Sequence, residues 1–102
     1  MREELGFENP FVFEFYNIMR KKWSYPLLRK MDPFRNYSFE EIVSLTQRRI
    51  NRTVLSEITK SWMFLGIMEK NGNKYTLTSK GTNIRVAFMN MEQHFQDAEF
   101  FK

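Results

Sequence analysis

The sequence predicts a mainly α-helical fold of the α+β class that carries one small β-hairpin. Apolar residues recur at helical spacing along most of the chain, and the segments with this spacing begin at residues that cap helices. The stretch 67–78 is different, because two short strand-like runs flank Asn71 and Gly72, a pair typical of a tight hairpin turn. We therefore expect a helical domain with a single two-stranded projection.

The composition is that of one folded domain spanning residues 1–102. Hydrophobic residues make up 42% of the chain and aromatic residues 17%, which argues against disorder. A length of 102 residues allows a modest core but not two independent ones. The absence of cysteine excludes disulfides, thiolate metal sites and cysteine nucleophiles.

The sequence carries no pattern of membrane insertion or export. The first six residues, Met-Arg-Glu-Glu-Leu-Gly, do not resemble a secretory leader. No apolar run approaches the roughly 20 residues that a membrane-spanning helix needs. We expect a soluble cytoplasmic protein, in the nucleoid or in the cytoplasm of a host.

Two helices are expected in the first third of the chain. Asn9 and Pro10 predict an N-cap and a first turn, and the N-terminal helix that they open covers residues 9–22. Ser24 is predicted to cap the next helix, which ends before Pro33. The N-terminal helix needs cover on more than one side, because its apolar residues form two adjacent rows. The rows are Phe11, Phe15 and Ile18, then Val12, Tyr16 and Met19.

Two further helices follow, joined by a short turn. Ser38 and Glu41 form the pattern of a capping box, which predicts a helix over residues 39–46. The turn occupies residues 47–50. Asn51 is a favourable N-cap for a longer helix, 51–65, with a glycine directly after it as the C-terminal stop.

Helix 51–65 is amphipathic. At about 100° per residue, apolar side chains gather on one face and short polar or basic ones on the other. The apolar face consists of Val54, Leu55, Ile58, Trp62 and Leu65. The outer face consists of Thr53, Ser56 and Lys60, with Arg52, Glu57 and Met63 at its margins. Such a face suits hydrogen bonding to base edges in a DNA groove, and it is equally typical of an ordinary solvated helix.

The hairpin follows this helix. Strands are predicted over 67–70 and 74–78, with Asn71 and Gly72 at the centre of a type I′ turn, which requires a positive φ at both residues. The polar residues near the tip are Lys70, Asn73 and Lys74.

The last predicted element is a long C-terminal helix over residues 79–101. Its apolar residues are spaced alternately four and three apart, as in helices that pack along a seam. They are Ile84, Phe88, Met91, Phe95 and Ala98.

The order of elements from 38 to 81 is that of a winged helix-turn-helix, in which helix 51–65 is the recognition helix and the hairpin is the wing. The charge distribution points to a polyanionic partner for this region. Residues 20–60 carry ten bases and four acids, net +6, whereas residues 1–19 are net −3 and residues 82–102 net −1. The alternative is that these bases only solvate helix faces.

Several stretches resemble winged-helix regulators of the HxlR, PadR and MarR type. The resemblance covers about residues 22–82, and its most specific part is the Tyr-x-Leu-Thr-x-x-Gly pattern of 75–81. The other stretches are 22–29, 38–42, 50–56 and 65–70. The chain departs from the family's pattern at Ile58 and Thr59 and in its shorter wing. Its cysteine-free, phenylalanine-rich composition is also similar to winged-helix proteins of archaea and their viruses.

The resemblance implies a transcription regulator that binds a pseudo-palindromic site in double-stranded DNA as a homodimer. The residues expected in the major groove are Arg52, Thr53, Ser56 and Lys60. Arg48 and Arg49 are expected at phosphates, and Lys70, Asn73 and Lys74 on the backbone beside the wing.

The two terminal helices are expected to form the homodimer interface, with packing inside one chain as the alternative. The interface residues would be Phe11, Phe15 and Ile18 of the first helix, and Ile84, Phe88, Met91 and Phe95 of the last.

Two other classes of function compete with DNA binding. An enzyme is disfavoured, because His94 is the only histidine and the four glycines form no phosphate-binding loop, so we expect no catalytic residue, cofactor or metal. The stronger alternative is a winged helix that binds protein as an adaptor without specific DNA binding. The sequence leaves open whether a small molecule regulates the protein.

Overall fold

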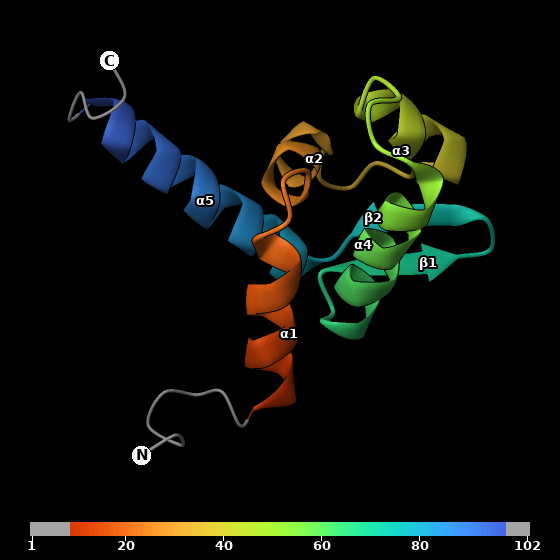
Figure 1. Cartoon of the computed structure of the whole chain (residues 1–102), viewed down its shortest axis with the longest axis horizontal. Coiled ribbons are helices and arrows are strands. Elements are labelled where there is room, and N and C mark those ends of the chain that lie inside the picture. The colour runs from red at the N-terminus through yellow and green to blue at the C-terminus, as the bar shows by residue number, and fades with distance from the viewer. Residues whose placement is uncertain (1–8, 98–102) are drawn as a thin grey trace.

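The computed structural model describes residues 9–97, and side chains as far as residue 94. In this part of the chain, five helices and one two-stranded antiparallel sheet form an α+β winged-helix fold, as predicted. The elements are α1 (Pro10–Met19), α2 (Ser24–Lys30), α3 (Phe39–Leu45), α4 (Arg52–Phe64), β1 (Met68–Asn71), β2 (Lys74–Leu77) and α5 (Ser79–Asp97). The hairpin projects on one side of the molecule and α5 extends on the other (Figure 1). The predicted end of the last helix lies outside the described residues.

The N-terminal helices differ from their prediction at one junction. Asn9 caps α1 as predicted, its side chain accepting hydrogen bonds from two backbone N–H groups. The helix ends at Met19, three residues before the predicted end at residue 22. The prediction that Ser24 caps α2 is wrong, because Ser24 is already helical and its hydroxyl donates to the carbonyl of Ile18 at the end of α1. The tight bend between the helices brings that carbonyl within reach.

The helix-turn-helix itself follows the sequence closely. The capping box of α3 is present, with Ser38 and Glu41 each accepting from the other's backbone N–H. Asn51 caps α4 by accepting from Val54 N at 2.8 Å. Between the two helices, Gln47 and Arg48 both adopt the left-handed region, with φ of 56° and 59°. This costs energy for non-glycine residues, so the turn is held by the packing of the helices that it joins.

The hairpin has a different turn from the one predicted. Asn71 pairs with Lys74, which places Gly72 and Asn73 at the centre. Gly72 has a φ of 61°, and Asn73 does not share this positive value. The type I′ prediction was therefore wrong: a positive φ at the first central residue alone is typical of type II′, which favours glycine there.

Tyr37, in the segment before α3, adds an isolated β-bridge to the two-stranded sheet. Tyr37 pairs with Tyr75 through two backbone hydrogen bonds of 2.8 and 2.7 Å. The sequence did not predict this bridge, since the two residues are distant along the chain. It attaches the segment before α3 to the wing.

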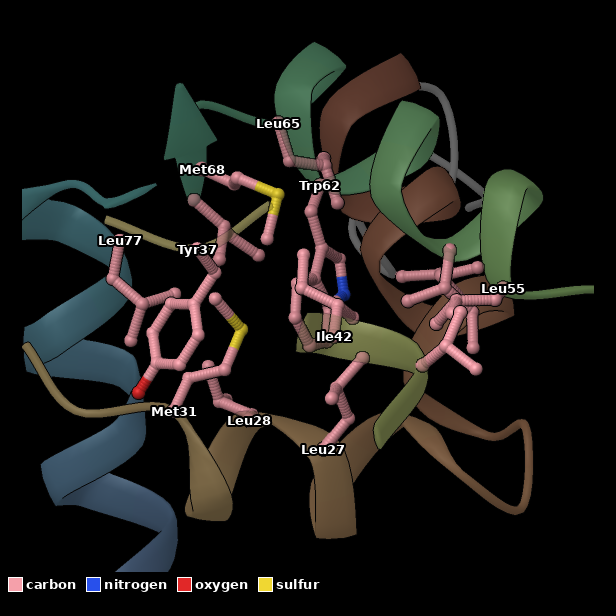
Figure 2. Close-up of a cluster of buried hydrophobic side chains, with 14 residues drawn as sticks. Leu27, Leu28, Met31, Tyr37, Ile42, Leu55, Trp62, Leu65, Met68 and Leu77 are labelled. Atoms are coloured by element: carbon pink, nitrogen blue, oxygen red, sulfur yellow. The ribbon is translucent and has the colours of Figure 1, made fainter. Parts of the chain in front are cut away.

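The core lies between the helices and the hairpin. Figure 2 shows labelled side chains from α2, α3, α4 and the hairpin converging on it. The predicted inner face of α4 is confirmed, because Leu55, Ile58 and Trp62 are completely buried and Leu65 is almost so. None of the helices in the described part of the chain is long and apolar enough to span a membrane.

Gly81 fixes the junction of α5 with the hairpin. A Cβ atom at this position would lie 2.1 Å from the carbonyl oxygen of Ile67, so only glycine fits. Thr78 completes the junction, since its backbone N–H donates to the same oxygen at 2.9 Å and its hydroxyl oxygen accepts from Gly81 N at 3.0 Å. The Thr-x-x-Gly part of the sequence pattern thus has a packing role.

Three basic side chains cap helix C-termini from neighbouring elements. Lys30 Nζ donates to the carbonyl of Leu45 at 3.0 Å, and Lys80 Nζ to that of Leu65 at 2.8 Å. Arg85 donates to the last carbonyls of α2 from two nitrogens. A cation is favourable at the negative end of a helix. Part of the basic charge therefore stabilises the fold.

Candidate nucleic-acid interface

The outer face of α4 is open and polar along its N-terminal half. Arg52, Thr53 and Lys60 are exposed and Ser56 is half-buried. Together with Phe39 and Glu57 they line a shallow hollow of ≈ 490 Å³ between α3 and α4. All four residues predicted for the major groove therefore share one surface.

Arg52 is held in place from two directions. Its guanidinium donates from Nη1 to Glu40 Oε1 at 3.4 Å and forms a second, closer bond from Nη2 to Oε2. The same guanidinium lies over the ring of Phe39, 5.5 Å from its centroid. Both charged side chains stay more than half exposed, at 56% for Arg52 and 58% for Glu40. No role for Glu40 was predicted from the sequence.

Lys60 lies at the border of this face. It also lines a second hollow, of ≈ 530 Å³, between α1 and the C-terminal half of α4. There Ser61 donates to Glu14 at 2.5 Å and the rings of Phe11 and Phe64 stack at 5.0 Å. Because α1 covers that end of α4, the free part of the outer face is the first two turns.

The bases predicted at phosphates are exposed in two places. Arg48 and Arg49 lie in the turn between α3 and α4. Lys70, Asn73 and Lys74 lie around the tip of the hairpin, and Lys70 Nζ is 5.4 Å from the ring centroid of Tyr75. The turn and the tip are therefore both free to contact a partner.

Lys74 of the hairpin lies near Glu41, in the first turn of α3. The backbone N–H of Ser38 lowers the pKa of this carboxyl below its usual value, and the charges of Lys74 and Arg35 lower it further. Arg35 also forms an ion pair with Glu41 at 3.8 Å. The positive charge of Lys74 is thus partly balanced within the chain.

The predicted dimer residues divide into exposed and internal ones. Phe11 and Met91 are 49% and 52% exposed. Phe15 and Phe88 are half-buried and stack on each other at 6.3 Å, and Ile84 is half-buried beside them. Ile18 is 3% exposed and belongs to the core of its own chain. The side chain of Phe95 lies outside the described residues.

Other apolar side chains, which the prediction did not include, are exposed on the same two helices. They are Val12, Phe13 and Tyr16 of α1 and Val86 of α5, each between 45% and 55% exposed. They were missed because the sequence pattern identifies which residues are apolar, whereas the tertiary packing decides which of them stay uncovered.

A polar contact anchors α5 to α2. Tyr25 Oη donates to Glu92 Oε1 at 2.5 Å, and Arg29 Nε donates to the same oxygen at 3.1 Å. Burial raises the pKa of Tyr25, and Glu92 raises it further. The hydrogen bond from Tyr25 lowers the pKa of Glu92, and Arg29 adds to this effect. The contact therefore favours a neutral phenol beside a charged carboxylate.

The structure resembles a solved bacterial protein over most of its length. No protein-family model and no curated protein sequence matches the chain. The chain is similar to YodB from B. subtilis, solved in its quinone-bound form, with a TM-score of 0.71 and 27% identity. The match covers 86% of this chain and 98% of that one. The likeness thus extends beyond the helix-turn-helix into the flanking helices.

Proposed function

We propose that this chain is a transcription regulator that binds double-stranded DNA as a homodimer, with α4 in the major groove and the wing on the flanking backbone. The observation that carries the proposal is the division of α4 into two faces. Its inner face is buried in the core, whereas the outer face of its first two turns is polar, with Arg52 and Thr53 exposed, and the exposed base Lys60 follows one turn later. The likeness to YodB over nearly the whole of that chain supports a winged-helix fold that includes the flanking helices.

The groove-facing residues would have separate roles. Arg52 supplies donors for guanine, and the hydroxyls of Thr53 and Ser56 can donate or accept at a base edge. Lys60, at the border with α1, would reach a phosphate. Arg52 is the one side chain in the first two turns of α4 that can donate two hydrogen bonds to a single base, so it would be the main base-reading residue.

The backbone contacts would come from two sides of the groove. Arg48 and Arg49 lie before α4, and the lysines of the wing lie after it in the chain. Phosphate contacts fix the register of a protein on the duplex without reading sequence. These four bases would therefore set the affinity and its dependence on salt.

The homodimer would use the exposed apolar side chains of α1 and α5. Apolar patches on a monomer mark interaction sites, and two copies with the same patch can bury it around a two-fold axis. The exposed apolar residues from which this interface would be drawn are Phe11, Val12, Phe13, Tyr16, Val86 and Met91, which lie on more than one side of the two helices. Ile18 is not part of it, because it is already buried.

Fluorescence anisotropy with random duplex DNA at rising salt tests the proposal. We expect log K to fall linearly with log salt concentration, because each neutralised phosphate releases counterions. A flat dependence, or no binding at low salt, would reject the DNA-binding function.

The second candidate is a protein-binding adaptor, and one observation favours it. Phe34 is 85% exposed and has a φ of 69°, at the third position of the turn 32–35. Glycine is the favoured residue there, so an exposed phenylalanine is unfavourable both for the backbone and for solvation. If Phe34→Gly leaves DNA binding intact but abolishes binding to a protein partner, the two functions coexist. If the anisotropy measurement shows no salt-dependent binding to duplex DNA, the protein-binding adaptor becomes the proposed function.

A further inference from the structure

The pair formed by Glu40 and Arg52 is placed where a DNA-binding surface would ordinarily avoid an acid. Glu40 is the second residue of α3 and Arg52 the first of α4. Their side chains meet at the edge of the hollow that Thr53 and Ser56 also line. A carboxylate therefore stands on the face that we propose to approach DNA.

This carboxylate contributes only modestly to the stability of the fold. Both charged groups are more than half exposed, and exposed ion pairs contribute little to folding. At the start of α3, Ser38 and Glu41 already form the capping box, and Glu40 adds only a favourable charge at the positive end of a short helix. Toward DNA, the same carboxylate repels phosphates and weakens non-specific binding.

The geometry of the pair matches one kind of base pair. In the major groove, a G·C pair presents the acceptors N7 and O6 of guanine and then the N4 donor of cytosine. An A·T pair presents an acceptor, a donor and an acceptor in the same order. A guanidinium next to a carboxylate offers donors followed by an acceptor, which is complementary to G·C alone.

The hydrogen-bonding capacity of the pair is sufficient for this. Arginine has five N–H donors, of which the contact with Glu40 uses two. The remaining donors are free for guanine. A carboxylate has about four lone-pair sites, so Glu40 can accept from cytosine N4 while it still holds Arg52. Phe39 beneath the guanidinium limits its motion, which reduces the entropy lost on binding.

We propose that Glu40 and Arg52 read one G·C base pair in each half-site as a unit, with Glu40 as a specificity determinant that lowers non-specific affinity. This inference rests on the proposed DNA-binding function. It goes further by naming the base pair recognised and the acidic residue that discriminates G·C from A·T.

The test uses selection of duplexes from a random library, followed by measured affinities for the selected site and its single-base variants. The variant is Glu40→Ala and the matched control is Glu57→Ala, which removes a carboxylate from the same hollow without touching Arg52. Thermal unfolding would be measured to check that both variants remain folded. Arg52→Lys is a second variant, because it keeps the charge but loses the planar paired donors.

We expect both alanine variants to bind random duplex more tightly than the parent. Only Glu40→Ala should reduce the preference for G·C at one position of the half-site, by about tenfold, and raise the salt slope as Arg52 becomes free to contact a phosphate. Arg52→Lys should lose preference at the same position.

Different failures have different meanings. If the parent binds no duplex, the proposed function itself is wrong. If the parent binds DNA but Glu40→Ala keeps its base preference within about twofold, or Glu57→Ala loses the same preference, the pair does not read a base. A parent that selects no G·C pair in its half-site would also overturn the inference while leaving DNA binding in place.

Discussion

Helices α4 and α5 are the two longest in the described chain, and they expose opposite kinds of surface. The inner face of α4 is buried in the core and the free face of its first two turns is polar, although Phe64 at its end is exposed and stacks on a phenylalanine ring of α1. Helix α5 packs through one side as far as Phe88 and Glu92, while Val86 and Met91 are exposed and its last part extends from the rest of the molecule (Figure 1). The inner face of α4 is covered within the chain, whereas Val86 and Met91 of α5 are not.

The proposed function assigns a different partner to each of these surfaces. A polar and basic face suits a hydrated polyanion, whereas an exposed apolar face is stabilised by a second apolar surface. Substitutions that alter one helix at a time can separate the two partners, from the largest expected effect to the smallest. If both helices served a single partner, changes to either would affect the same measurement.

Gly81→Ala should have the largest effect, because it acts where α5 joins the core. The new Cβ would collide with the carbonyl of Ile67, so we expect a loss of about 3 kcal/mol in unfolding free energy. Urea titration measures it. Gly72→Ala is the matched control: it has no close neighbour, so only the positive φ costs energy, about 1 kcal/mol. Equal losses of unfolding free energy for the two variants would mean that the backbone at the junction shifts to make room for the new Cβ.

The double variant Val86→Glu, Met91→Glu should separate the proposed dimer. Both side chains are exposed, so the fold should remain while two like charges on each copy oppose association. We expect light scattering to give the mass of a monomer and operator affinity to fall by roughly a hundredfold, because bivalent binding is lost. Ser44→Glu, exposed on α3, controls for the added charge. An unchanged mass would remove α5 from the interface.

Arg52→Ala should act on DNA binding alone. We expect affinity for the selected site to fall by about tenfold, since the variant can no longer donate two hydrogen bonds to a base, with little change in melting temperature. Lys60→Ala should weaken binding less, because Lys60 lies at the border beside α1. A change in oligomeric mass with either variant would contradict the separation of the two helices.

Local patterns predicted the elements of the fold because the responsible hydrogen bonds are local. The caps formed by Ser38 and Asn51 each join residues three positions apart, and the structure confirms both. The faces of α4 follow from the helical period in the same way. The sequence therefore located the proposed groove-facing residues on one exposed surface.

Interactions between distant residues were not accessible to the same reasoning. The pairing of Tyr37 with Tyr75 and of Glu40 with Arg52 depends on how separate elements meet. The use of Lys30, Lys80 and Arg85 as helix caps was hidden in the same way, and Lys30 is one of the ten bases of residues 20–60, so fewer than ten are free for a partner. Ile18 has the spacing of a seam residue, and only the packing of α1 shows that it is internal.

Substitution of the wing lysines should change DNA affinity less than Arg52→Ala does, and without regard to base sequence. Lys70→Ala should weaken binding to all duplexes alike and reduce the salt slope by about one, because one phosphate is no longer neutralised. Lys74→Ala should have less effect, because its charge is partly balanced by Glu41. Anisotropy at several salt concentrations measures both. A weakening that depends on base sequence would instead assign the wing a reading role.

Glu92→Gln should produce the smallest effect, confined to acid stability. The folded pKa of Glu92 is lowered from 4.5, mainly by the hydrogen bond from Tyr25. A carboxyl with a lowered folded pKa stabilises the fold above its unfolded pKa, and this contribution is lost as the pH falls through the folded value. The parent should therefore lose stability more steeply than Glu92→Gln below about pH 4.5.

Urea titrations at several pH values provide the measurement, with Glu57→Gln on α4 as the matched control. The unfolding free energy of Glu57→Gln should fall with decreasing pH as that of the parent does, because this variant leaves the contact between α2 and α5 intact. If Glu92→Gln also follows the parent, the contact does not anchor α5. The direction of α5, and with it the apolar face offered to a second copy, would then depend on the packing of Phe88 against Phe15 and Tyr25.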